Sequence, residues 1–68
     1  MATDISVRQL SSGWWHIRRG SAWCQLPSWP CSDVAAIREH TFEAEWRERF
    51  VRDVAELAMQ ADEAGRRA

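Results

Sequence analysis

The sequence predicts an α+β fold, in which a three-stranded antiparallel meander packs on a C-terminal amphipathic helix. Short segments of alternating apolar and polar residues, separated by turn residues, fill the first part of the chain, and this is the pattern of half-exposed strands. A longer segment near the C-terminus repeats its apolar residues at helical spacing. A chain of 68 residues has room for one core, so we expect a single domain over 1–68. Its tryptophan-rich meander and proline loop occupy 1–31, and its helical part occupies 32–68.

Three strands are expected at about 4–10, 14–18 and 22–26. Between the first two strands, Ser11–Gly13 suits a three-residue turn that a left-handed glycine closes. Between the second and third strands, Arg19–Gly20 suits a two-residue turn. Pro27 ends the third strand, because proline has no N–H group to donate to a sheet.

The two turns determine which residues lie opposite each other, and therefore which side chains share a face of the sheet. We expect Val7 opposite Ile17 and Ile17 opposite Ala22. One face then carries the apolar set Ile5, Val7, Trp15, Ile17, Ala22, Cys24 and Leu26. The other face carries Ser6, Arg8, Leu10, Trp14, His16, Arg18, Trp23 and Gln25. Arginine adopts a left-handed conformation poorly, so a longer Arg19–Ser21 loop that reverses the third strand is the alternative.

A stiff connector with two prolines, Pro27–Cys31, leads from the meander to a short helix at about 33–39. Trp29 in this connector is expected to close one end of the core. Ser32 is the expected N-cap of the short helix. Val34 and Ile37, three residues apart, are expected to face inward.

The main helix is expected at about 42–63, after Thr41 as a second candidate N-cap. Gly65 is expected to end it and to leave a frayed tail over 64–68. The inward stripe of this helix consists of Phe50, Val54, Leu57, Ala58 and Ala61, extended by Trp46 and Phe42. Its solvent face is expected to carry the i,i+4 ion pairs Glu43–Arg47, Glu45–Arg49 and Glu48–Arg52.

Composition limits the location and the partners of the chain. A net charge of −1 gives no overall attraction to nucleic acid or to anionic membranes. No apolar run approaches the ~20 residues of a membrane span, and the first residues lack the apolar segment of a signal peptide. We therefore expect a cytoplasmic protein with no membrane partner, in which Cys24 and Cys31 are reduced. A disulfide between them would require the Pro27–Pro30 loop to fold back.

Two adjacent tryptophans point toward function. Neighbouring residues on a strand point to opposite faces of the sheet, so Trp14 and Trp15 cannot share one side. A single helical layer can shelter Trp15, but it leaves Trp14 and Trp23 on an uncovered face with arginines. Tryptophan and arginine are enriched at the hot spots of protein interfaces. The expected binding residues are Trp14, Trp23, Arg8, Arg18, His16 and Gln25.

Three other interpretations of this face stay open. Trp14 and Trp23 could pack on each other and only stabilise the sheet. A homodimer could bury the face against a second copy, since such a patch rarely stays exposed without a use. The face could also bind single-stranded nucleic acid or regulate transcription, because bases stack on aromatic side chains. Because the net charge is −1 and lysine is absent, nucleic-acid binding is a weaker prediction than protein binding.

Catalytic and metal chemistry have little support in the sequence. His16, Cys24, Cys31 and His40 are ligand types for zinc, but they lack the close cysteine spacing of a structural site. The acidic residues lie mostly on the solvated helix, and no base is placed beside a serine. A chain of this size also has little room for a ligand cavity of ~300 Å³. We therefore expect no enzyme activity, no cofactor and no bound metal.

In size, compactness and lack of catalytic residues, the chain resembles the small stand-alone proteins of bacteriophages and mobile elements. All of its basic residues are arginine, which fits a GC-rich genome. Such proteins commonly occlude or remodel a host protein, as anti-defence inhibitors do. The resemblance implies a non-enzymatic interaction module that inhibits or regulates a host protein.

Overall fold

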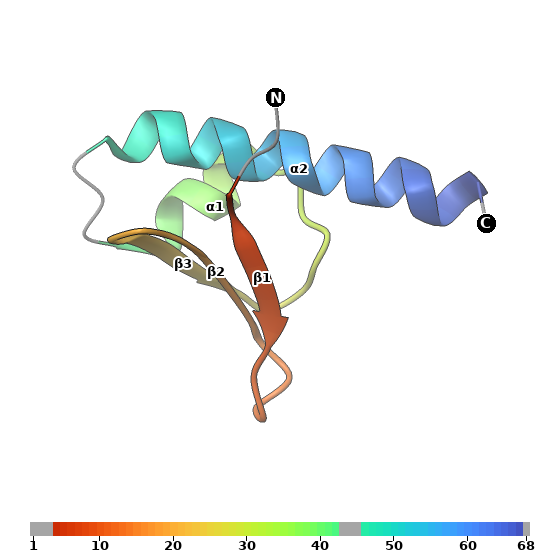
Figure 1. Ribbon diagram of the computed structural model, residues 1–68, viewed down its shortest axis with the longest axis horizontal. Helices are drawn as coiled ribbons and strands as arrows, with labels where there is room; N and C mark the ends of the chain where they lie inside the picture. The colour runs from red at the N-terminus through yellow and green to blue at the C-terminus, as the bar shows by residue number, and fades with distance from the viewer. Residues whose placement is uncertain (1–3, 43–45, 68) are drawn as a thin grey trace.

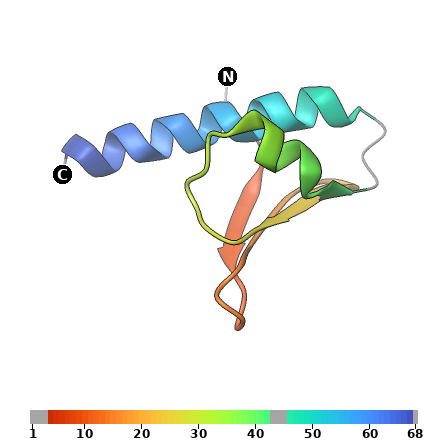
Figure 2. The ribbon, with the colours of Figure 1, turned by 180° about the vertical axis from the view of Figure 1, so that it is seen from behind.

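The computed structural model describes residues 4–42 and 46–67 and has the predicted α+β architecture (Figure 1). Its elements are β1 (Ser6–Gln9), β2 (Trp15–Arg19), β3 (Ala22–Leu26), α1 (Val34–Glu39), β4 (Thr41–Phe42) and α2 (Arg47–Arg67). Within the described residues, the strands form one antiparallel sheet in the order β1-β2-β3-β4. Both helices lie on the same side of this sheet (Figures 1 and 2). The sheet therefore has one face covered by helices and one face that no described helix covers.

The first hairpin has the predicted register. Val7 lies opposite Ile17, and Arg8 lies opposite His16. Gly13 closes the turn with a φ of 96°, a backbone conformation that glycine adopts without a steric penalty. The prediction of a three-residue turn that ends in glycine is confirmed.

The second hairpin differs from the prediction by two residues. Its turn consists of Gly20 and Ser21, so that Arg19 is the last residue of β2 and pairs with Ala22. Gly20 has a φ of 59°, and glycine takes this left-handed position more easily than arginine does. Ile17 consequently lies opposite Cys24 instead of Ala22. Because the shift is an even number of residues, every side chain keeps its predicted face.

The segment expected to begin the main helix forms the edge strand β4 instead. Thr41 pairs with Cys24, and Phe42 pairs with Trp23. Thr41 is not an N-cap: it is buried, and its Oγ1 donates a hydrogen bond to the carbonyl of Ile37 at 2.6 Å. A β-branched residue next to an aromatic one fits a strand better than the start of a helix. Phe42 therefore leaves the predicted stripe of α2 and joins the sheet.

The short helix α1 has its N-cap one residue later than predicted. Asp33, and not Ser32, caps it, and Asp33 Oδ1 accepts the backbone N–H of Ala35 at 3.0 Å. Ile37 is fully buried as predicted, whereas Val34 is exposed. The prediction for Val34 was wrong because α1 is less than two turns long, and its first turn lies at the margin of the core.

The helix α2 begins later and ends later than the predicted 42–63. Residues 43–45 lie outside the described part of the chain. The helix continues through Gly65 to Arg67, so the expected stop and frayed tail are corrected. A single exposed glycine costs a helix only about 1 kcal/mol and does not have to end it. The C-terminal part of α2 projects past the sheet (Figure 1), which explains why Ala61 is exposed rather than buried.

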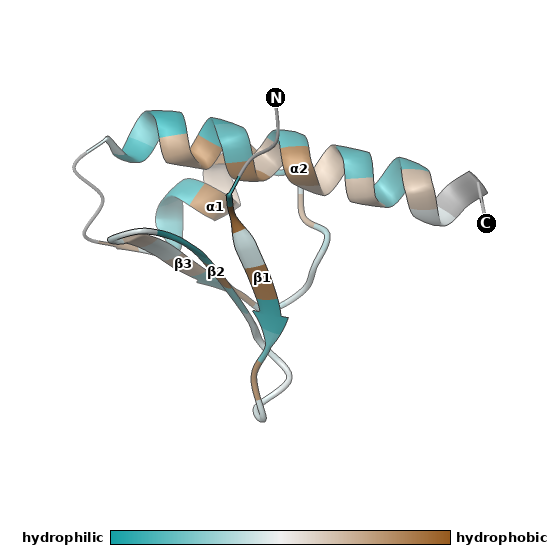
Figure 3. Ribbon diagram, viewed as in Figure 1, coloured by the Kyte–Doolittle hydropathy of each residue, from teal (hydrophilic) through white to brown (hydrophobic). Residues whose placement is uncertain are grey.

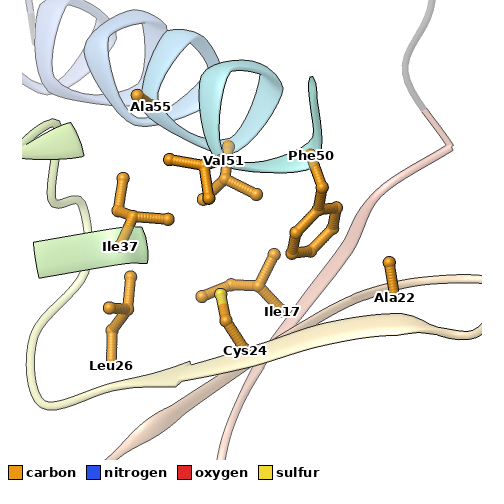
Figure 4. Packing of buried hydrophobic residues seen from close by; sticks show 9 residues of the cluster. Ile17, Ala22, Cys24, Leu26, Ile37, Phe50, Val51 and Ala55 are labelled. Atoms are coloured by element: carbon orange, nitrogen blue, oxygen red, sulfur yellow. The ribbon is translucent and has the colours of Figure 1, made fainter. Parts of the chain in front are cut away.

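The core lies between the covered face of the sheet and the two helices (Figure 4). Hydrophobic and hydrophilic stretches alternate along the ribbon of α2 (Figure 3), and its buried residues are Phe50, Val51, Val54, Ala55 and Ala58. Trp29 packs against the core as predicted, together with Ile5, Val7, Trp15 and Cys31. The buried cluster consists of Ile17, Ala22, Cys24, Leu26, Ile37, Phe50, Val51, Val54 and Ala55.

The charged surface of α2 makes a contact that helical spacing does not predict. The carboxylate of Glu48 accepts two hydrogen bonds from Arg38 of α1, at 2.8 and 2.7 Å, rather than pairing with Arg52. This bidentate contact lowers the pKa of Glu48. The expected pairs Glu43–Arg47 and Glu45–Arg49 each include a residue outside the described ranges.

Two further observations concern location and redox state. In the described part of the chain, no helix is both long enough and apolar enough to cross a membrane. Cys24 and Cys31 are free thiols. Cys24 is buried in the core, and Cys31 is half-buried beside it.

Candidate functional site

The face of the sheet that carries no helix gathers side chains from all four strands and their ends. We call this surface the open face. It contains the six residues predicted to bind, and two further aromatic side chains that the prediction did not include. Its members are Ser6, Arg8, Trp14, His16, Arg18, Trp23, Gln25, His40 and Phe42.

A row of three aromatic rings crosses the open face from β2 to β4. The rings of His16 and Trp23 are stacked, with centroids 5.7 Å apart and planes at 25°. The rings of Trp23 and Phe42 are 5.2 Å apart and tilted by 35°. Since β3 lies between β2 and β4, Trp23 has an aromatic neighbour on each side. Phe42 lies at the end of the row and is 44% exposed.

Trp14 lies directly before β2 and forms a separate part of the open face. Its ring meets that of His40 edge to face, with centroids 5.8 Å apart and planes at 83°. It makes no ring contact with Trp23, although both residues are described. Trp14 is 39% exposed, so a single contact with His40 leaves much of the indole accessible.

His40 and Phe42 are the residues of this face that sequence reasoning missed. They flank Thr41, so an alternation of three residues places both on the side opposite to that buried hydroxyl. The backbone carbonyl of His40 accepts the N–H of Gln25, which places His40 beside β3. The only signal in the sequence was this three-residue alternation, which is too short to distinguish a strand from the start of a helix.

Two arginines lie on the β1–β2 half of the open face. Arg8 and Arg18 are exposed, and neither has an acidic partner within residues 4–42 and 46–67. The Nε of Arg18 donates to the carbonyl of Gly20 at 2.9 Å, which leaves its terminal N–H groups for a ligand. A hollow of about 320 Å³ lies between the residues Ser6, Arg8, His16 and Arg18. A second hollow of about 350 Å³ is lined by His16, Arg18, Gly20, Ser21, Trp23 and Gln25.

The positive charge of this half acts on the histidine within it. Burial, followed by the charges of Arg8 and Arg18, lowers the pKa of His16 below its ordinary value of 6.5. His16 is therefore neutral at pH 7. A neutral imidazole offers one donor and one acceptor, so the positive charge of the β1–β2 half near pH 7 comes from the two guanidinium groups.

The histidines and cysteines that the sequence offers as metal ligands do not gather into one group within the described residues. Burial raises the pKa of the Cys24 thiol to about 11, so this sulfur is protonated and a poor nucleophile. Among the described residues, no group of three or more His, Cys, Asp or Glu side chains could hold a metal ion. Cys24 faces the core, on the side of the sheet opposite to His16.

The chain was compared with protein-family models, with curated proteins and with solved structures, and no significant match was found.

Proposed function

We propose that the chain is a non-enzymatic protein-interaction module that binds a partner protein through the open face. One observation carries the proposal: exposed aromatic rings share a face with two arginines that have no acidic partner among the described residues. Large aromatic anchors beside arginine are the usual anatomy of an interface hot spot. A module that covers a partner's surface without changing it chemically would act as an inhibitor or regulator, and we extend the proposal to that role for a host protein.

The ring geometry favours a protein over single-stranded nucleic acid. Bases bind such faces by stacking on free aromatic rings, but Trp23 already has His16 on one side and Phe42 on the other. The cationic groups are also few. Proteins that depend on phosphate contacts often make about 6–10 of them, whereas the described open face presents two guanidinium groups.

The charges also disfavour a second copy of this chain as the partner. In a two-fold dimer the same patch meets itself, so the open faces would bring Arg8 and Arg18 of one protomer toward those of the other. Like charges that face each other across an interface cost free energy. A different protein that supplies complementary groups avoids this cost.

The test is a pair of double substitutions that remove similar amounts of exposed apolar surface. Trp14→Ala with Phe42→Ala truncates the open face, and Val34→Ala with Met59→Ala is the control, since both of these residues are exposed on the helices. A partner is captured from source cells, identified by mass spectrometry, purified, and titrated against each variant by calorimetry.

Loss of two interface aromatics should weaken binding by at least about 100-fold, because hot-spot truncations cost about 2 kcal/mol or more each. The control should bind like the wild type, and both variants should remain folded at the temperature of the titration. Equal affinity of the two double variants would overturn the proposal. Salt-sensitive retention on single-stranded DNA that the first variant loses would replace it with the nucleic-acid reading.

A further inference from the structure

The hollow between β1 and β2 has the composition of a carboxylate site. In the register of the hairpin, Ser6 lies opposite Arg18 and Arg8 lies opposite His16, so the two arginines are diagonal neighbours on one face. Side chains in this relation are about 7–8 Å apart at their bases, which allows both guanidinium groups to reach one small anion. The hollow between them measures about 320 Å³.

The charges inside this hollow are not balanced by acidic groups of the described part of the chain. Arg19, the neighbour of Arg18, has Asp53 and Asp4 as acidic partners, but Arg8 and Arg18 have none among the described residues. Burial, followed by the charges of Arg8 and Arg18, lowers the pKa of His16 in this hollow. Arginine binds carboxylates in a bidentate manner, so an acidic group on a ligand would relieve the repulsion between the two guanidinium groups.

The cationic hollow lies directly beside the aromatic row. His16 and Arg18 line both hollows of the open face, and Trp23 and Phe42 continue the surface toward β4. Adjacent strands are about 4.8 Å apart, so the middle of the arginine pair is about 10 Å from the middle of the aromatic pair. An extended peptide advances about 3.3 Å per residue and its alternate side chains share one side. Side chains two or four residues apart, about 7 or 13 Å, therefore bracket this distance and both face the sheet.

From this juxtaposition, and resting on the proposed function, we infer that the partner presents an extended acidic segment to the open face. A carboxylate of this segment binds Arg8 and Arg18, and an apolar side chain two or four residues away, on the same side of the segment, packs on Trp23 and Phe42. The chemical class of the partner is therefore an acidic peptide segment with an apolar anchor. It is neither a phosphate backbone nor a second copy of this chain.

The experiment uses a short synthetic peptide, blocked at both ends, with two adjacent glutamates, two serines and then a leucine. The matched probe has glutamine in place of each glutamate. Binding to the isotopically labelled chain is followed by the NMR shifts of the tryptophan indole N–H and arginine Nε–H groups at near-physiological salt. The glutamate peptide should shift Arg8, Arg18 and Trp23, and should bind about tenfold more tightly than the glutamine peptide.

Two double arginine variants, which change the net charge by the same amount, test whether the preference for glutamate depends on Arg8 and Arg18. Arg8→Gln with Arg18→Gln should abolish the preference for glutamate over glutamine. Arg47→Gln with Arg52→Gln, on the exposed surface of α2, should keep the preference. Since all four arginines are exposed, both variants should keep the dispersed spectrum of a folded chain.

Three outcomes overturn the inference. They are equal binding of the two peptides, shifts confined to α2, and tighter binding of a short oligothymidine or of inorganic phosphate than of the glutamate peptide. Failure of this inference is distinguishable from failure of the proposed function by means of the identified partner. In one such result, the partner binds the Arg8→Gln, Arg18→Gln variant and fails to bind the Trp14→Ala, Phe42→Ala variant. This result would support binding through the open face and would refute the inference of an acidic segment.

Discussion

The two faces of the sheet carry the same residue types and use them differently. Trp14 and Trp15 are neighbours, and so are Arg18 and Arg19, and each pair is divided between the faces. On the covered face, Trp15 packs on the core, and the Nη1 of Arg19 donates to Asp53 at 2.9 Å while its guanidinium lies 4.9 Å from the Trp46 ring centroid. On the open face, Trp14 and Arg18 remain exposed.

The difference arises because the helices lie on one side only. Asp53, Trp46 and Phe50 all come from α2 or its start, and they supply Arg19 with an anion and two rings. On the open face, the Arg18 side chain donates to the carbonyl of Gly20 and has no acidic partner among the described residues. The covered face therefore shows how an arginine next to aromatic rings is satisfied when a partner element is present. In the described part of the chain, no helix supplies Arg18 on the open face with an anion and rings of this kind.

The largest expected difference between the faces concerns two phenylalanines. Phe50→Ala removes a fully buried ring and should lower the free energy of unfolding by about 3–5 kcal/mol. Phe42→Ala removes an exposed ring with one recorded ring neighbour and should cost about 1 kcal/mol. Urea denaturation measures both values. Similar losses for the two variants would contradict the assignment of Phe42 to an uncovered face.

The covered face should also make stability sensitive to alkali. The pKa of the Cys24 thiol is raised from 9.0 to about 11 by burial, so the unfolded chain loses this proton first. Stability should be constant below pH 9 and should then fall by at most about 1.4 kcal/mol per pH unit toward pH 11. The chain contains neither tyrosine nor lysine, which leaves few other groups to titrate in this range.

Chemical denaturation as a function of pH measures the effect. Cys24→Ala should abolish the alkaline decline, whereas Cys31→Ala should retain it. A decline of the same slope in both variants would show that another group is responsible.

The two neighbouring arginines should differ by a smaller amount. Arg19→Ala leaves the half-buried Asp53 without its partner and should cost about 1–2 kcal/mol. Arg18→Ala should change stability by no more than about 0.5 kcal/mol, as is usual at exposed positions. A double-mutant cycle with Asp53→Ala separates the pair from other effects of the substitution. If the cycle gives no coupling, the Arg19–Asp53 contact contributes nothing to stability.

The smallest expected effect is a loss of stability below pH 6.5 that originates from His16 on the open face. The pKa of His16 is lower in the folded chain than its ordinary 6.5, so its contribution is complete above pH 6.5 and is lost as the pH falls further. Protonation adds a positive charge next to Arg8 and Arg18, which weakens the fold slightly. His16→Gln should flatten the decline in the thermal midpoint just below pH 6.5, and Arg8→Gln with Arg18→Gln should reduce it. An unchanged profile in His16→Gln would refute this assignment.

Most of the sheet could be predicted from local alternation. The faces of Ile17, Cys24, Trp23 and Arg18 follow from the strand period, and they survive a two-residue error in the second turn because an even shift preserves facing. The six predicted binding residues accordingly lie on one surface. Helix ends were less predictable: Ser32 and Asp33 are both good N-cap residues, and only the backbone geometry selects Asp33.

By itself, the sequence determined that adjacent tryptophans must separate and that α2 has one apolar side, because both properties depend on repeats of two or about 3.6 residues. Only the tertiary structure decided that residues 41 and 42 join the sheet, that Trp23 lies between His16 and Phe42, and that Arg19 meets Asp53. These contacts join residues that are distant in the chain, so which residues meet depends on how the helices pack on the sheet. No local repeat encodes such a choice.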